Sequence, residues 1–361
     1  MRLKALVFGV ALIASACTTT AYDPNMGAGG SGGTGGGGSA GSGGGGSGGG
    51  GTGGSGGGGG TGVGADKSGP ITADQEWSGA ITISGDVTVN AGVTLTIDAG
   101  TLIQVAAGKA LIVNGTLKVN GTTASTVMFT PNPTPGTWDG IQVQAGGAAT
   151  ISWANLAYPT TGLSCATGAT TCSIDHSKVT NYSSVGMSLM VTATLDHVTV
   201  DTGGSGGVVI QGAATDTVTI TDSTFHHTGG DAVIADSGNM TLSYSHMYGD
   251  MVGGGAGVHC ATHIATAGVV LADHNILEDA NYGLMASNMA ATSKINLNNF
   301  LGYGSGSTGG AYSPASGALI TAGVDLTNNY WNGQAPPTGT GTTLTTTTYQ
   351  TTQVPGCGPR P

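Results

Sequence analysis

Hydrophobic and polar residues alternate in short runs along the chain from Trp77 onward. Two such runs read "AITISGDVTVNAGVTLTIDAGTLIQV" and "ALIVNGTLKVNG", with an apolar side chain at every second position. Glycine or Asn-Gly interrupts the alternation every six to ten residues. This pattern predicts short β-strands joined by tight turns. Beyond the N-terminal segment, no stretch carries the apolar stripe of an amphipathic helix, so we expect an all-β fold.

A longer repeat becomes visible after Thr150. A leading apolar residue is followed by a second one five positions later, in the pairs Ile151/Leu156, Ile174/Val179, Leu195/Val200, Ile220/Phe225, Leu242/Met247, Leu271/Ile276, Ile295/Phe300 and Leu326/Trp331. From Ile151 to Leu326 is 175 residues in seven intervals, a mean period of 25. A unit of this length cannot bury its own apolar face and must stack on its neighbours. We therefore expect coils of two or three strands, stacked about 4.8 Å apart in parallel sheets.

Small polar residues recur three positions after the leading apolar residue. They are Ser177, Ser223, Ser245, Asn298 and Asn329, while Ala154, Val198 and His274 interrupt the series. Polar side chains stacked at one bend can hydrogen-bond along the stack. They would then fix its register.

Several segments resemble the right-handed parallel β-helix repeat family, specifically its secreted and lipoprotein members. The segment 85–105 looks like the family's opening coil, 127–131 and 138–143 look like the coils that follow, and "NNYWNG" at 328–333 is similar to its closing motif. The resemblance spans roughly Trp77 to Gly333 and implies a parallel β-helix solenoid, which at 25 residues per coil should hold about ten coils. It is specific for fold but not for function, because the family includes enzymes, adhesins and many proteins of unknown role.

Composition agrees with this fold. The 361-residue chain has 70 glycines and only 7% charged residues, which suits strands and turns better than helices. Its net charge of −11 would repel nucleic-acid phosphates, so we expect no nucleic-acid partner.

The N-terminus reads "MRLKALVFGVALIASAC", a short basic region followed by an apolar core too short to span a bilayer. Residues 1–16 are expected to be an export signal. A cysteine directly after Ala-Ser-Ala resembles the lipobox of bacterial lipoproteins, which implies that Cys17 carries lipid. In that family Thr18 favours the outer membrane, with the protein facing the periplasm or the surface.

A long glycine-rich tract separates this terminus from the repeats. Residues 17–26 form the expected lipidated N-terminus, 27–64 a disordered linker, 65–335 the β-helix, and 336–361 a Thr-rich C-terminal segment. A Gly/Ser chain of the linker's length has a root-mean-square span of roughly 35 Å. We therefore expect a monomer held away from the membrane by a flexible leash.

Four further cysteines predict disulfides in an exported protein. Cys165 and Cys260 each follow a repeat glycine by three residues, which places them at equivalent positions four coils apart, beyond disulfide reach. We therefore expect Cys165–Cys172 within one coil and Cys260–Cys357 between the solenoid and the C-terminal segment. The spacing does not suit a zinc site.

Candidate chemistry lies two positions after the leading apolar residues. In successive coils these residues are Trp153, His176, His197, Asp222, Tyr244 and Asp273, and Asp175 and Asp196 stack one position earlier. Such a row suits sugar or cation binding, or general acid/base work on a glycoside. His with Asp could also bind a transition metal, and the plainest alternative is a solvated strand face.

Other chemistries are disfavoured. The only arginines are Arg2 and Arg360, so the body lacks the cations that β-elimination beside a carboxylate requires. Methionines at the apolar positions fill core space rather than bind copper. We expect no cofactor or metal, and a structural, adhesive or glycan-binding module. A glycoside hydrolase that uses the Asp/His row is the alternative.

Overall fold

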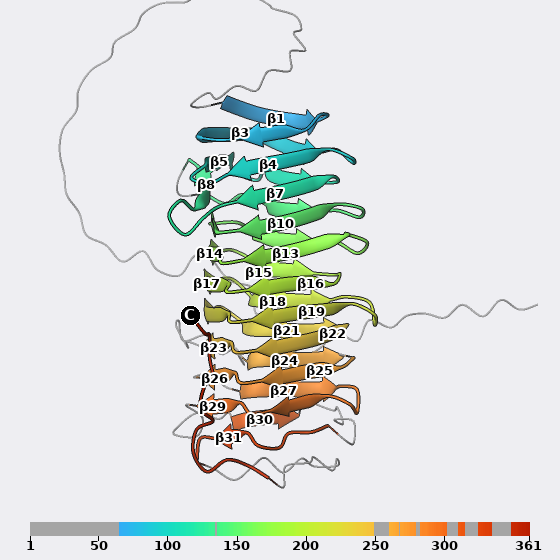
Figure 1. Cartoon of the computed structure of the whole chain (residues 1–361), viewed down its shortest axis with the longest axis vertical. Coiled ribbons are helices and arrows are strands. Elements are labelled where there is room, and N and C mark those ends of the chain that lie inside the picture. The colour runs from blue at the N-terminus through green and yellow to red at the C-terminus, as the bar shows by residue number, and fades with distance from the viewer. Residues whose placement is uncertain are drawn as a thin grey trace, which may run out of the picture. The chain divides into compact units, whose positions relative to one another are not determined.

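The computed structural model of the chain describes residues 65–133, 136–248, 260–266, 268–278, 282–301, 310–314, 324–333 and 348–361. Every regular element in them is a β-strand, and the strands stack in one column from β1 to β31 (Figure 1). The predicted signal segment, Cys17 and the glycine-rich linker lie outside these residues. Among the described residues, none belongs to a helix long and apolar enough to cross a membrane.

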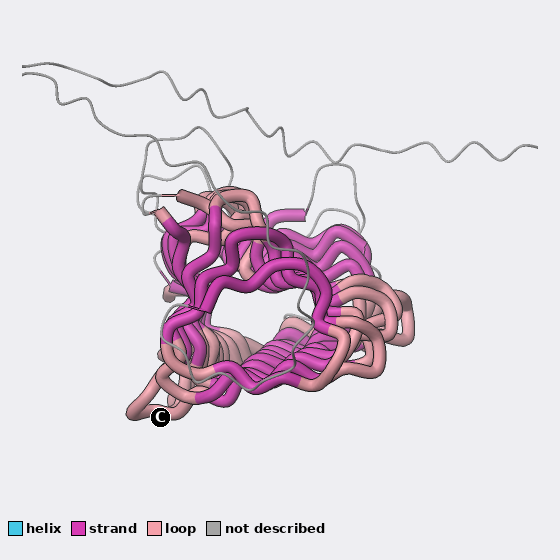
Figure 2. Tube along the Cα trace, turned by 90° about the horizontal axis from the view of Figure 1, so that it is seen from above, coloured by secondary structure: helices cyan, strands magenta, loops and turns pink. Residues whose placement is uncertain are grey.

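Three faces of parallel strands surround one axis, as the view along that axis shows (Figure 2). The first face contains β1 (Ala65–Ile71), β3 (Ala80–Val89), β5 (Leu102–Ala106), β8 (Val127–Asn132), β11 (Ala154–Ala157), β14 (Lys178–Tyr182), β17 (Thr199–Gly203), β20 (Thr224–Thr228), β23 (His246–Tyr248), β26 (Ile276–Glu278), β29 (Asn299–Leu301) and β31 (Tyr330–Trp331). The second face contains the C-terminal half of β3, then β6 (Ala110–Val113), β9 (Gly140–Val143), β12 (Leu163–Cys165), β15 (Val185–Leu189), β18 (Gly206–Gln211), β21 (Asp231–Ser237), β24 (Cys260–Thr266), β27 (Tyr282–Asn288) and β30 (Gly310–Pro314). The third face contains β2 (Gln75–Trp77), β4 (Thr94–Asp98), β7 (Thr116–Asn120), β10 (Ala148–Ser152), β13 (Thr171–Asp175), β16 (Ala193–Asp196), β19 (Thr217–Thr221), β22 (Asn239–Ser243), β25 (Val270–Asp273) and β28 (Lys294–Asn296).

The repeat read from the sequence corresponds to one coil of this solenoid. Each coil runs along the third face, bends into the first face, and then continues into the second. Ile151 pairs with Ile174, Ile174 with Leu195, and Leu195 with Ile220, so the leading apolar residues stack in register. The ten described strands of the third face are separated by nine turns, which confirms the expected parallel solenoid of about ten coils.

A sharp bend joins each third-face strand to the next first-face strand. The residue at this bend has a left-handed backbone with φ between 45° and 61° at Trp153, His176, His197, Asp222, Tyr244, His274, Leu297 and Asn328. We call these eight residues the bend ladder. Residues other than Gly, Asn and Asp seldom adopt this left-handed conformation. Hydrogen bonds to the next coil support it here; the His176 N–H, for example, donates to the Asp196 carbonyl over 2.9 Å.

Buried polar side chains follow the bend and fix the register, as the sequence predicts. The Ser177 Oγ accepts a hydrogen bond from the Ala154 N–H at 2.9 Å, and the Asn298 Oδ1 accepts one from the Asn275 N–H at 3.0 Å. In the coil where His274 was expected to interrupt the series, Asn275 continues it by accepting a bond from the Ser245 N–H at 2.9 Å. The series is therefore longer than the sequence indicated.

The predicted register is wrong by one residue in that coil. Leu242 pairs with Ala272, and Leu271, which was expected to lead the coil, is 41% exposed whereas Ala272 is 7% exposed. The shift moves Asp273 off the bend and places His274 there. Both Leu271 and Ala272 are apolar, so hydrophobicity alone could not distinguish which one faces the core.

One of the two predicted disulfides is present. Cys165 and Cys172 are bonded at the loop between β12 and β13. Cys357 is a free thiol whose Sγ donates to the Leu297 carbonyl at 3.3 Å, so the predicted Cys260–Cys357 bond is wrong. Cys260 starts a second-face strand, whereas Cys357 lies at the bend between the other two faces. Ile264, not Cys260, occupies the position equivalent to Cys165.

The end of the chain runs back along the stack. Residues 348–361, which we call the C-terminal tail, pass from β31 toward β23 (Figure 1). Backbone bonds attach the tail at Asn328 and Tyr330, and further on the Gly358 N–H donates to the His274 carbonyl at 2.9 Å. The tail thus follows the bend ladder from its C-terminal end.

Candidate functional site

The bend ladder forms a row of stacked rings on one edge of the solenoid. The Trp153 and His176 rings lie 4.4 Å apart with planes 21° from parallel, and the His176 and His197 rings lie 4.6 Å apart at 3°. Further along, the Tyr244 and His274 rings are 4.9 Å apart at 11°. These separations follow the coil spacing of about 4.8 Å, since each ring comes from the same position of a successive coil.

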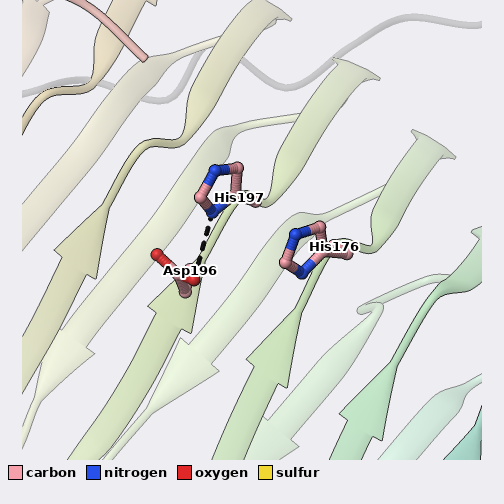
Figure 3. Close-up of side chains that lie close together, drawn as sticks. All are labelled: His176, Asp196 and His197. Atoms are coloured by element: carbon pink, nitrogen blue, oxygen red, sulfur yellow. Dashed lines mark hydrogen bonds and ion pairs between the residues drawn. The ribbon is translucent and has the colours of Figure 1, made fainter. Parts of the chain in front are cut away.

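An aspartate precedes three of the histidines and fixes their orientation. The Nδ1 atoms of His176, His197 and His274 lie 3.1, 3.1 and 3.0 Å from a carboxylate oxygen of the residue before each. Figure 3 shows the His176 and His197 rings side by side just beyond the third-face strands, with the Asp196 carboxylate bonded to His197. The carboxylate holds one ring nitrogen and leaves Nε2 as the other polar atom.

An open groove lies beside the N-terminal part of the ladder. Its volume is about 410 Å³ and its lining comprises Thr126, Trp153, Ala154, Asn155, His176, Ser177, Lys178, His197 and Thr199. Its lining combines the rings of three successive bends with residues at the start of β11, β14 and β17. We call it the bend groove.

The C-terminal tail occupies the ladder beyond this groove. Arg360 places its guanidinium over the Tyr244 ring, with Cζ 3.7 Å from the ring centroid, and its Nε and Nη2 donate to both carboxylate oxygens of Asp222 at 2.8 and 2.7 Å. Asp222 is buried as a result. The hydrogen bonds from Arg360, more than its charge, hold the pKa of the Asp222 carboxyl below its usual range.

A family model for the "right handed beta helix region" matches residues 139–342, more than half of the chain. The chain belongs to this right-handed β-helix family. No curated protein and no solved structure matched it. Membership in this family agrees with the parallel coils and shows that the solenoid is right-handed. It does not show which chemistry, if any, the bend groove performs.

The β-helix places the sequence-predicted site residues in three groups. Trp153, His176 and His197 come together at the bend groove, with Asp175 and Asp196 directly behind the histidines. Asp222 and Tyr244 stand in the same row but are engaged by Arg360. Asp273 lies one position before the bend and holds His274.

The sequence interpretation missed four residues in this region of the β-helix. His274 takes the ladder position assigned to Asp273, and its signal was the Asp-His dipeptide that also occurs at 175–176 and 196–197. Lys178 and Asn155 also line the groove, and each stands two residues after a bend residue, so their signal was a second offset in the repeat. The contact of Arg360 with Asp222 could not be predicted from a local sequence pattern, because the two residues are 138 positions apart.

The two carboxylates nearest the groove are already hydrogen-bonded within the protein. Asp175 accepts a bond from the Ser152 hydroxyl at 2.6 Å in addition to its contact with His176, and Asp196 accepts one from the Thr221 hydroxyl at 2.6 Å. Asp175 and Asp196 are register partners in adjacent coils, as the sequence predicts. Their present bonds suit the positioning of the histidine rings.

Proposed function

We propose that this β-helix is a lipid-anchored protein of the bacterial cell envelope that binds an extended glycan in the bend groove without cleaving it. The observation that carries the proposal is the open groove of about 410 Å³ beside the Trp153–His176–His197 stack. A row of rings with polar edges beside a groove is suited to sugar rings, which have both apolar faces and hydroxyl groups.

Trp153 is the first ring of the row and supports this proposal. Ser152 pairs with Asn120 in the preceding coil, so the residue next to Asn120, Gly121, lies against Trp153 and carries no side chain. A Cβ at position 121 would meet the Trp153 carbonyl oxygen at 2.1 Å, so the position is restricted to glycine. The Trp153 face turned away from His176 therefore has no ladder side chain over it and can stack on a sugar ring.

Two further residues that line the groove supply polar groups. Asn155 lines the groove, and its Oδ1 is buried and accepts no hydrogen bond from the described part of the chain. Burying an amide oxygen without a partner costs about 1–3 kcal/mol, and a ligand hydroxyl would recover that energy after a small side-chain movement. Lys178, which is exposed, adds a cation to the groove lining.

The C-terminal tail sets the length of ligand that fits. Because Arg360 covers Asp222 and Tyr244, the open ladder extends only from Trp153 to His197, three coils or roughly 10 Å. The ligand would thus contact the groove over a few sugar units of a longer chain.

The N-terminal sequence supports the cellular setting of the proposal. The signal segment, the cysteine at position 17 and the glycine-rich linker would place the groove at a distance from the membrane while keeping it attached. A protein that binds a fixed envelope or surface polysaccharide would need this reach.

The direct test is a glycan-array screen of the full chain, followed by titration calorimetry with each glycan that binds. We expect binding of an extended polysaccharide, weakened at least tenfold by His197→Ala with an unchanged circular dichroism spectrum. The absence of binding to any extended glycan would leave only a structural role.

Glycoside hydrolysis is a second candidate, favoured by the stacking of Asp175 and Asp196 in adjacent coils behind the groove. Incubation of the bound glycan with the protein, followed by an assay for new reducing ends, distinguishes the two. We expect none. Reducing ends that Asp196→Asn abolishes would replace the binding proposal with a catalytic one.

A further inference from the structure

We propose that His176 and His197 bind one divalent transition-metal ion through their Nε2 atoms, with Asp175 and Asp196 as orienting groups. The sequence alone led us to expect no metal. The positions of the two rings and their carboxylates change that expectation, and they do so independently of any glycan.

The carboxylates determine which ring nitrogen is free. A carboxylate within 3.1 Å of Nδ1 accepts the proton of that nitrogen as a hydrogen bond, in His176 and in His197 alike. In the neutral ring the lone pair then lies on Nε2. A carboxylate–histidine pair of this kind is the usual outer support of a metal-binding imidazole.

The carboxylates are themselves held in place. Ser152 donates to Asp175 and Thr221 donates to Asp196, each at 2.6 Å. Every part of the arrangement comes from a third-face strand end or from the bend after it, so the β-sheet fixes the spacing. The two histidines are therefore supported in the same way, one coil apart.

The separation of the rings is compatible with a shared ion. The ring centroids are 4.6 Å apart and the planes are nearly parallel, and one ligand atom from each of His176, Asp196 and His197 lies within 4.8 Å of the others. Two nitrogens on one tetrahedral ion at about 2.0–2.1 Å must be roughly 3.3 Å apart. Because the planes are only 3° from parallel and each Nε2 lone pair lies in its ring plane, both rings must also turn out of the stack, by tens of degrees, to point at one ion. The side chains are 36% and 28% exposed, which leaves room for this turn.

The donor set selects the class of metal. Neutral imidazoles favour Zn²⁺, Cu²⁺ or Ni²⁺, whereas Mg²⁺ and Ca²⁺ require oxygen ligands. The remaining coordination positions would face solvent on the groove side. Because the two carboxylates already hold ring nitrogens and hydroxyl groups, we assign them a positioning role.

His274 provides an internal control for the metal-binding proposal. His274 has the same preceding aspartate and the same bend conformation, but its stacking neighbour is Tyr244 and not a histidine. A single imidazole cannot chelate. His274→Ala should thus leave metal binding unchanged, although it removes an equally placed ring.

The test is titration of the metal-stripped full chain with Zn²⁺ by calorimetry, and with Cu²⁺ by electron paramagnetic resonance. We expect His176→Ala and His197→Ala each to bind one ion fewer than the wild type, with loss of the two-nitrogen splitting of the Cu²⁺ signal. His274→Ala and Trp153→Ala should retain both. Asp196→Asn should weaken Zn²⁺ binding about 10- to 100-fold.

Mg²⁺ titration serves as the negative control and should give no heat. The proposal is overturned if the wild type binds neither Zn²⁺ nor Cu²⁺, or if the double variant His176→Ala/His197→Ala keeps the wild-type stoichiometry. Because Trp153→Ala is expected to lose glycan but retain metal, failure of this proposal and failure of glycan binding are distinguishable.

Discussion

Arg360 and Asp222, 138 residues apart in sequence, form a bidentate ion pair at the bend ladder, with N–O distances of 2.8 and 2.7 Å. The Arg360 N–H donates to the same carboxylate at 2.9 Å, so the backbone of the tail is attached as well as its side chain. The C-terminal segment is thus attached to the solenoid by this ion pair together with backbone hydrogen bonds, and not by the expected disulfide.

Arg360→Ala should release the end of the tail without unfolding the coils. Hydrogen exchange at residues 356–361 should become faster. Exchange in β19 and β20 should stay slow, because hydrogen bonds to the neighbouring strands of the parallel sheets hold these two strands. Arg360→Lys is the matched control and should restore only part of the protection, since a lysine cannot form the fork-like pair. Exchange in the tail that does not respond to Arg360→Ala would contradict this account.

Acid should release the tail in the same way. The pKa of Asp222 is lower in the folded state, so its contribution is fully present above the pKa of an unfolded aspartate, about 3.9. That contribution is lost as the pH falls through the lower folded value. Tail protection should therefore be constant from pH 8 to pH 5 and should be lost only below about pH 4.

The solenoid could be predicted from the sequence because each coil repeats one local pattern. Pairs such as Ile220 and Phe225 face the core and recur with the coil, so their spacing encodes the stack. The exact register failed at Leu271 because two adjacent apolar residues fit the pattern equally. The Asp-His dipeptides at 196–197 and 273–274 mark the bend in both coils and would have corrected it.

The candidate site was predictable in part, for the same reason. Trp153, His176 and His197 share one offset in the repeat, and the fold brings equal offsets together. The groove residues Asn155 and Lys178 also share one offset, two residues after the bend, but the covering by Arg360 depends on a tail outside the repeat. No periodicity carries that information.

The corrected register predicts opposite outcomes for two neighbouring substitutions. Ala272→Asp places a charge in the core and should cost several kcal/mol of unfolding free energy. Leu271→Asp alters an exposed side chain and should change stability by no more than about 0.5 kcal/mol. Thermal unfolding of the two variants measures the difference. Equal destabilisation, or the reverse order, would mean that the register in β25 is wrong.

Cys357 should react slowly with alkylating reagents. Burial raises the pKa of its thiol to about 11, so little of the reactive thiolate is present at pH 8. Iodoacetamide labelling followed by peptide mapping should find a Cys165–Cys172 disulfide and an unmodified Cys357, and labelling should become faster in Arg360→Ala. A peptide linking Cys357 to Cys260 under non-reducing conditions would instead restore the second disulfide.

Cys17→Ser should release the protein from membranes. The N-terminal sequence predicts lipid at this cysteine, and an apolar anchor is needed because the body itself is acidic. Fractionation of cells expressing the wild type and the variant measures the effect, with a Thr18→Ser variant as the control. If Cys17→Ser and the wild type associate equally with membranes, the prediction of a lipid anchor at Cys17 is wrong.

The central claim is that ligand binds against the open face of Trp153, and the most direct measurement compares two aromatic substitutions. Trp153→Ala removes the first ring of the bend groove, whereas Tyr158→Ala removes an exposed ring nearby that does not line it. Calorimetric titration of both variants with a glycan that the wild type binds should give at least a tenfold loss for Trp153→Ala and none for Tyr158→Ala. Unchanged affinity in Trp153→Ala, or an equal loss in both, would show that the bend groove is not the binding site.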